Sequence, residues 1–140
     1  MTKSPSSDQA VSIPAPALRP YITRYEGYYA NGLTPGFHAG LPSRYVHIFI
    51  SLDEPIDIVR MPRPSARAAA FTSFVSGLQD TPAIVRNGNS VHGMHVFLTP
   101  FGVPALLGAS AAELTSCVLD LCDFWGRSAH GLVDRLRSAG

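Results

Sequence analysis

Residues 44–52 (RYVHIFISL) alternate in the manner of a β-strand. On an extended chain successive side chains point to opposite faces, so the segment has two distinct sides. One side carries Val46, Ile48, Ile50 and Leu52, and the other carries Tyr45, His47, Phe49 and Ser51. Because both sides include apolar groups, the pattern predicts a central strand that is covered on both faces. Residues 53–55 (DEP) then predict a tight turn, and so a hairpin, into a strand over residues 56–59.

Four further segments have the composition of strands: residues 21–29, 69–78, 83–86 and 91–98. Asn87-Gly88-Asn89 separates the last two, and Asn-Gly suits the positive φ angles of a tight hairpin turn. We therefore expect a second hairpin that joins residues 83–86 to residues 91–98. Residues 1–16 are rich in Ser, Pro and Ala without a sustained period, which predicts a disordered leader.

The pattern changes to helical after residue 98. Residues 103–107 form an apolar turn of helix before Gly108, and Ser110 with Glu113 is a capping box that predicts a helix to about Val118. A last helix is expected from a cap at Ser128 through Leu136. With strands over about residues 21–98 and helices over about 103–137, we expect one domain over residues 17–140. The fold class is mainly β with C-terminal helices (α+β), an antiparallel barrel or sandwich followed by two or three helices.

Composition narrows the function classes. Of the 140 residues, 46% are hydrophobic and 15% charged, which excludes wholesale disorder. Eleven basic and ten acidic residues give a net charge of +1, too little to hold nucleic acid on its own. Cys117 and Cys122 make no disulfide framework, and no signal sequence or apolar run of membrane-spanning length is present. A cytoplasmic protein without a membrane partner is expected.

Signatures of catalysis are missing from the sequence, which contains no Gly-rich phosphate loop, no G-x-S-x-G and no C-x-x-C. We therefore predict no catalytic residue, no cofactor and no metal site, since a metal site would have to assemble His38, His47 and His95 from separate strands. These three histidines and Arg44 are instead the candidate lining of a ligand pocket. Gly93, on the same face as His95, leaves a gap that a neighbouring side chain or a ligand could fill.

Residues 93–114 (GMHVFLTPFGVPALLGASAAEL) and 118–126 (VLDLCDFWG) resemble the sensor half of AraC-type bacterial transcription regulators. The resemblance is to a subgroup with a poorly characterised N-terminal domain. Earlier segments agree in order and spacing: LRPYI at residues 18–22, GLPSR at 40–44, and SGL at 76–78 ahead of PA at 82–83. The likeness covers roughly residues 16–136.

The resemblance implies a cupin-like domain that senses an unidentified small-molecule effector and forms a homodimer. In such regulators DNA is bound by a separate C-terminal domain with two helix-turn-helix units, and no such domain is expected in this chain. The chain would then be a sensor cut at a domain boundary, a truncated gene product or a stand-alone sensor. Leu132, Val133 and Leu136 form an apolar stripe that a second copy or the domain's own strands could cover. Two alternatives stay open: a small metal-dependent, cupin-like barrel enzyme, and an assembly module without a ligand.

Overall fold

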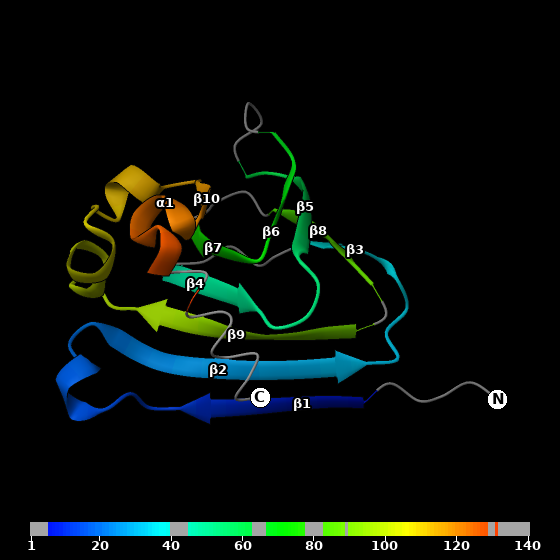
Figure 1. Ribbon diagram of the computed structural model, residues 1–140, viewed down its shortest axis with the longest axis horizontal. Helices are drawn as coiled ribbons and strands as arrows, with labels where there is room; N and C mark the ends of the chain where they lie inside the picture. Colours follow the sequence, from blue (N-terminus) through cyan, green and yellow to red (C-terminus); the bar gives the residue numbers. More distant parts are fainter. Residues whose placement is uncertain are drawn as a thin grey trace.

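The computed structural model describes residues 6–39, 45–62, 67–77, 83–88, 90–128 and 131, and its regular structure is mainly two antiparallel sheets (Figure 1). The larger sheet contains, in spatial order, β1 (Ser6–Ser12), β2 (Ile22–Asn31), β9 (Ser90–Leu98), β4 (Val46–Ser51), β7 (Ser73–Ser76) and β10 (Val118–Asp120). The smaller contains β3 (Gly36–Ala39), β8 (Ile84–Asn87), β5 (Ile56–Arg60) and β6 (Ala69–Phe71). The prediction of a mainly β chain is confirmed. Within the described residues the sheets do not close into a barrel.

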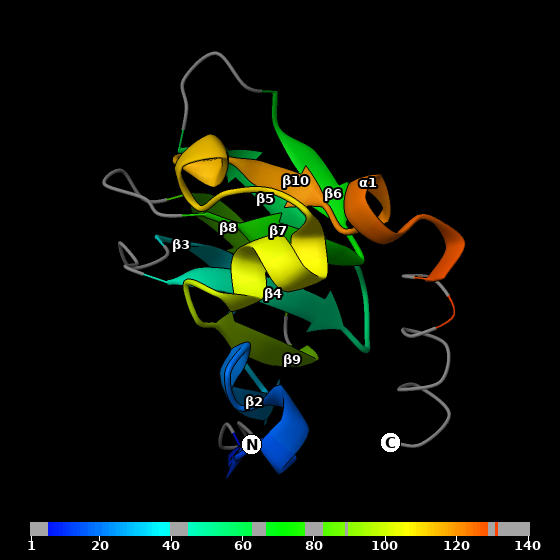
Figure 2. The same ribbon diagram turned by 90° about the vertical axis from the view of Figure 1, so that its left-hand side faces the viewer.

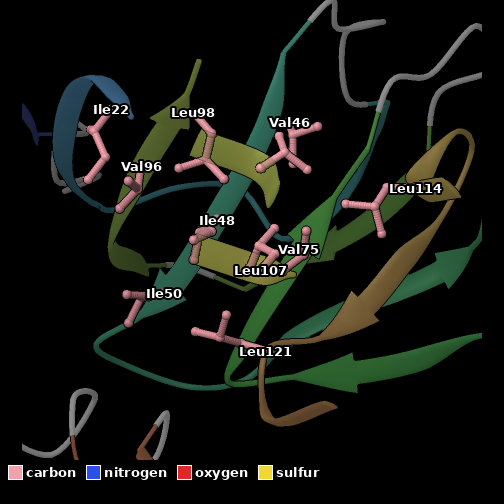
Figure 3. Packing of buried hydrophobic residues seen from close by; sticks show 11 residues of the cluster. Ile22, Val46, Ile48, Ile50, Val75, Val96, Leu98, Leu107, Leu114 and Leu121 are labelled. Carbon is pink, nitrogen blue, oxygen red and sulfur yellow. The ribbon is translucent and has the colours of Figure 1, made fainter. Parts of the chain in front are cut away.

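Strand β4 lies inside the larger sheet, between β9 and β7. Its aliphatic face is buried: Val46, Ile48 and Ile50 are between 1% and 3% exposed. These side chains belong to a core that also contains Leu107 and Leu121 from the C-terminal segments (Figure 3). The opposite face, with His47 and Phe49, is turned toward the smaller sheet, so the prediction of a central strand covered on both sides is confirmed.

Both predicted hairpins are wrong as strand pairs. β5 follows β4, and β9 follows β8, but in each case the two strands lie in different sheets. The reason is that a strand can pair along two edges only. Both edges of β4 are paired, with β9 and β7, and both edges of β9 are paired, with β2 and β4. The two turns therefore carry the chain from one sheet to the other.

The expected disordered leader differs from the structure at residues 6–12. This segment forms β1, which pairs antiparallel with β2 from Ser6 opposite Asn31 to Ser12 opposite Tyr25. Ladder hydrogen bonds use the main chain only, so a polar segment without a hydrophobic period can still add to the open edge of β2. Val11 on β1 remains 60% exposed, which explains why no hydrophobic pattern marks the strand.

The C-terminal part consists of short helical turns: η2 (Val103–Leu107), η3 (Ala112–Leu114) and α1 (Cys122–Trp125), which Figure 2 shows on the side of β4 and β7. Another short turn, η1 (Pro16–Leu18), precedes β2. The helical turn predicted at residues 103–107 is confirmed. So is the capping box, because the Glu113 amide donates to Ser110 Oγ (3.2 Å) and the Ser110 amide donates to Glu113 Oε1 (3.4 Å).

The helix that this box was predicted to begin ends at Leu114 rather than near Val118. Residues 118–120 instead pair with β7 as β10, and this ladder requires an extended chain. The indole Nε1 of Trp125 donates to the Leu106 carbonyl oxygen (2.7 Å), which fastens α1 to η2. The last helix predicted, through Leu136, falls largely outside the described residues.

Gly77 marks the closest approach between the sheet and these turns. Its amide donates to the Cys117 carbonyl oxygen (3.1 Å), and a Cβ at this position would lie 1.7 Å from the Leu114 carbonyl oxygen. A side chain of any size would therefore push η3 away from the end of β7.

We predict that Gly77→Ala lowers the free energy of unfolding by about 3 kcal/mol, because the clash is with main-chain atoms that cannot rotate away. Urea denaturation of the two proteins measures the difference. Gly27→Ala is the matched control, since a Cβ there meets nothing within 4 Å, and it should leave stability equal or slightly higher. An equally stable Gly77→Ala protein would contradict the packing described.

Candidate ligand cavity

A cavity of about 1430 Å³ lies between the two sheets. Strands β4, β7 and β9 of the larger sheet and β5 and β8 of the smaller sheet contribute its walls. Ligand pockets commonly measure about 300–1,000 Å³, so this space is large enough for a small molecule. Its floor is the face of the larger sheet opposite the aliphatic core.

Strand register places two of the three predicted histidines, His47 and His95, on this floor. His95 on β9 lies opposite Phe49 on β4, and His47 on β4 lies opposite Phe97 on β9. The imidazole ring centres of His47 and His95 are 6.3 Å apart, and both residues line the cavity. Alternation along β4 had assigned His47 to the face opposite the aliphatic residues, and that assignment is confirmed.

Aromatic rings cover much of the floor. The Phe49 ring is stacked on Phe74 with centroids 4.6 Å apart, and it meets the edge of His95 at 4.0 Å. The Tyr28 ring in turn lies edge-on to His95 at 4.9 Å. Such offset and edge-to-face contacts are favourable, so the rings hold one another in place.

Tyr28 reaches the cavity through the gap left by Gly93. The two residues are cross-strand partners on β2 and β9, and a Cβ on Gly93 would lie 2.7 Å from Tyr28 Oη. The expectation that a neighbouring side chain could fill this gap is confirmed. Tyr28 lines the cavity but was not among the candidate pocket residues predicted from the sequence. The glycine opposite it was the available signal.

The polar groups of the floor are uncharged at neutral pH. Burial, with a smaller contribution from the Arg24 charge, lowers the pKa of His47 to about 4, against the opposing effect of Glu26. Burial also lowers the pKa of His95 to about 4, with His47 adding to it and Glu26 opposing it. Burial raises the pKa of Tyr28.

Arg24 and Glu26 form an ion pair beside the histidines. Arg24 Nε donates to Glu26 Oε1 (3.0 Å), and the guanidinium carbon lies 3.9 Å from the centre of the Phe97 ring. Glu26 is opposite His95 in the β2–β9 ladder. The carboxylate is thus engaged with Arg24, which limits how far it stabilises a protonated imidazole.

The charged residues of the lining, here called the rim, are partly or fully exposed to solvent. Among the described lining residues they are Asp53, Glu54, Asp57 and Arg86. Asp57 lies 3.7 Å from Arg86, its cross-strand partner, and Asp53 accepts a hydrogen bond from Ser90 Oγ (3.0 Å). Three acidic groups and one basic group make this rim net negative.

Two of the predicted pocket residues lie beyond what the structure describes. The main chain of His38 is in β3, opposite Val85 of β8, but its side chain is outside the described part, and Arg44 is outside the described residues altogether. In the described ranges no group of three His, Cys, Asp or Glu side chains is placed to hold a metal ion. The described residues of the cavity offer imidazole and phenol groups as hydrogen-bonding partners.

We predict that the protein loses stability as the pH falls from 7 to 4.5. The unfolded chain takes up protons on His47 and His95 near pH 6.5 and the folded chain only near pH 4, so acid favours unfolding across this window. Each histidine contributes on the order of 2 kcal/mol, because one pKa unit equals about 1.4 kcal/mol and cavity water reduces the full value.

Urea denaturation at the two pH values measures the loss. His95→Phe keeps an aromatic ring in place and should remove about half of the pH-dependent loss of stability. Phe74→Leu removes a ring from the same cavity but no titrating group, so it should lower stability at both pH values and leave the pH dependence unchanged. An unaltered pH dependence in His95→Phe would contradict the assignment.

No family model, curated protein or solved structure matches this chain. None of the helices in the described ranges has the length and apolar character needed to cross a membrane. The described lining of the cavity combines two uncharged imidazoles and a phenol on an aromatic floor with a net negative rim.

Proposed function

We propose that this chain is the effector-sensing and dimerisation domain of an AraC-type transcription regulator. One observation supports this most: a single sheet borders both the cavity and the C-terminal segments. On β4, His47 and Phe49 face the cavity, while Ile48 and Ile50 alternate with them and pack into the core on the other side. A bound molecule would therefore contact the strand on which the C-terminal turns rest.

The C-terminal turns are well placed to report on that strand. Leu107 of η2 and Leu121, at the start of α1, gather around Ile48 and Ile50 in the core (Figure 3). Trp125 links α1 back to η2 through its hydrogen bond to Leu106. Effector control requires only that the ligand bind unequally to two arrangements of these turns on the sheet.

Dimerisation through Leu132, Val133 and Leu136 is part of the proposal. These residues lie outside the described part of the chain, so their support is the apolar stripe itself and the resemblance of the sequence to dimeric regulators. The first of them, Leu132, is seven residues beyond Trp125, the last residue of α1. A signal that moves α1 would consequently reach the stripe within a few residues.

The two alternatives have less support from the cavity. A metal-dependent enzyme needs a set of ligands that the described residues do not provide. An assembly module without a ligand has no use for a space of about 1430 Å³ between its sheets. Sensing accounts for both the cavity and the absence of catalytic motifs from the sequence.

The proposal predicts that the chain can replace the sensor half of a regulator. The chain is fused to a paired helix-turn-helix domain that binds its operator only as a dimer, and transcription from a reporter is measured. The fusion should regulate the reporter, and Leu132→Asp should abolish regulation, because a buried charge at the interface opposes association.

Phe101→Asp is the matched control. It also replaces an apolar residue by aspartate, but Phe101 is 76% exposed, so regulation should persist. Analytical ultracentrifugation of the chain alone at micromolar concentration should show a dimer that Leu132→Asp dissociates. A monomer in both proteins, with an inactive fusion, would refute the proposed function.

A further inference from the structure

The walls of the cavity favour a flat, aromatic ligand. The Phe49 ring is stacked with Phe74 (4.6 Å between centroids) and with His47 (5.5 Å), and it contacts His95 edge-on (4.0 Å). Because these rings pack against one another, they have little freedom to rearrange around a flexible aliphatic ligand. A further planar ring can add to this set by the same stacking and edge contacts, which are worth more than burial of area alone.

The hydrogen-bonding groups of the floor are neither purely donors nor purely acceptors. A neutral imidazole has one donor nitrogen and one acceptor nitrogen, and a phenol can both donate and accept. Tyr28 and His95 are adjacent on the floor, with ring centres 4.9 Å apart, and both line the cavity. A hydroxyl or carbonyl group on a ligand can pair with such partners without bringing a charge into the cavity.

A cationic group is disfavoured at the floor. Arg24 already places a positive charge against Phe97, next to His47, and its carboxylate partner Glu26 is engaged with it. The same surroundings disfavour the protonated imidazole at His47 and His95. A cation bound at the floor would be subject to the same burial cost as a protonated imidazole there.

An anionic group is disfavoured as well. Among the described lining residues Arg86 is the sole Lys or Arg, and its exposed side chain lies 3.7 Å from Asp57. Asp53 and Glu54 add negative charge to the same rim. An anion would approach a net negative set of charges, and Arg24, which lies beside the floor but not in the lining, is already paired with Glu26.

We infer that the cavity binds an uncharged aromatic molecule that carries a hydroxyl or carbonyl group, with its ring against Phe49 and its polar group at Tyr28 and His95. This inference rests on the proposed sensing function for its biological meaning, since it names the chemical class of the effector. It excludes sugars because they lack an aromatic ring. It excludes amino acids, aromatic acids and protonated aromatic amines because they carry charge.

Three probes of the same ring system test the charge preference: 2-naphthol, 2-naphthoate and 2-naphthylmethylammonium. Their binding to the purified chain is measured at pH 7 by isothermal titration calorimetry. The uncharged naphthol should bind at least tenfold more tightly than either charged probe. Equal or tighter binding of naphthoate or of the ammonium probe would overturn the inference, and so would the absence of binding by all three.

Two variants locate the bound probe. Tyr28→Phe and His95→Phe each keep a ring and remove the hydrogen-bonding atoms, so each should weaken naphthol binding about five- to tenfold. Tyr29→Phe removes the same hydroxyl from the next residue of β2, which is not in the cavity lining, and should leave the affinity unchanged. Naphthol affinity that neither cavity substitution alters would overturn the placement.

The reporter fusion separates failure of this inference from failure of the proposed function. Regulation by the fusion, and its loss in Leu132→Asp, depend on dimerisation and not on the identity of the ligand. A chain that regulates the reporter but prefers naphthoate has the proposed function with a different effector class. A chain that binds naphthol as expected but neither dimerises nor regulates has the ligand class without that function.

Discussion

The two-residue period of β4 is the constraint on which the rest of the structure depends. Ile48 and Ile50 bury one side of the strand in the aliphatic core, and His47 and Phe49 are thereby turned to the other. A shift of one residue in register would place an imidazole among aliphatic side chains and an isoleucine in the cavity. The core therefore fixes the cavity floor, because the burial that stabilises one face determines which residues form the other.

This arrangement has a cost that the core offsets. Burial makes the charged forms of His47, His95 and Tyr28 unfavourable. The residues that line the cavity also make fewer packing contacts than residues of a filled core. The opposite face carries eleven buried residues in one continuous cluster (Figure 3). One face of the sheet therefore supplies most of the packing that stabilises the domain, and the other face is less well packed, which fits the proposed sensing function.

Local patterns were predictable from the sequence and strand pairing was not. Alternation of residues 46–51 depends on the nearest neighbours only, as does the capping box of Ser110 and Glu113, and both are present. The hairpins predicted around residues 53–55 and 87–89 did not form, because β4 and β5, and likewise β8 and β9, lie in different sheets. Which strand pairs with a given edge depends on segments far away in sequence. β7 and β9 pair with the two edges of β4, one of which the predicted hairpin would have required.

The same distinction applies within the site. His47 and His95 were foreseeable because each lies on a strand whose own alternation shows its two faces. Tyr28 was not, because its part in the cavity depends on standing opposite Gly93, 65 positions along the chain from it. Gly93 has no side chain, so it leaves space on this face of the sheet. The Tyr28 ring occupies that space, and its phenol therefore lies beside His95. The polar floor thus arises from a pairing between strands, so register, more than the identity of any one residue, brings the phenol and the imidazoles together.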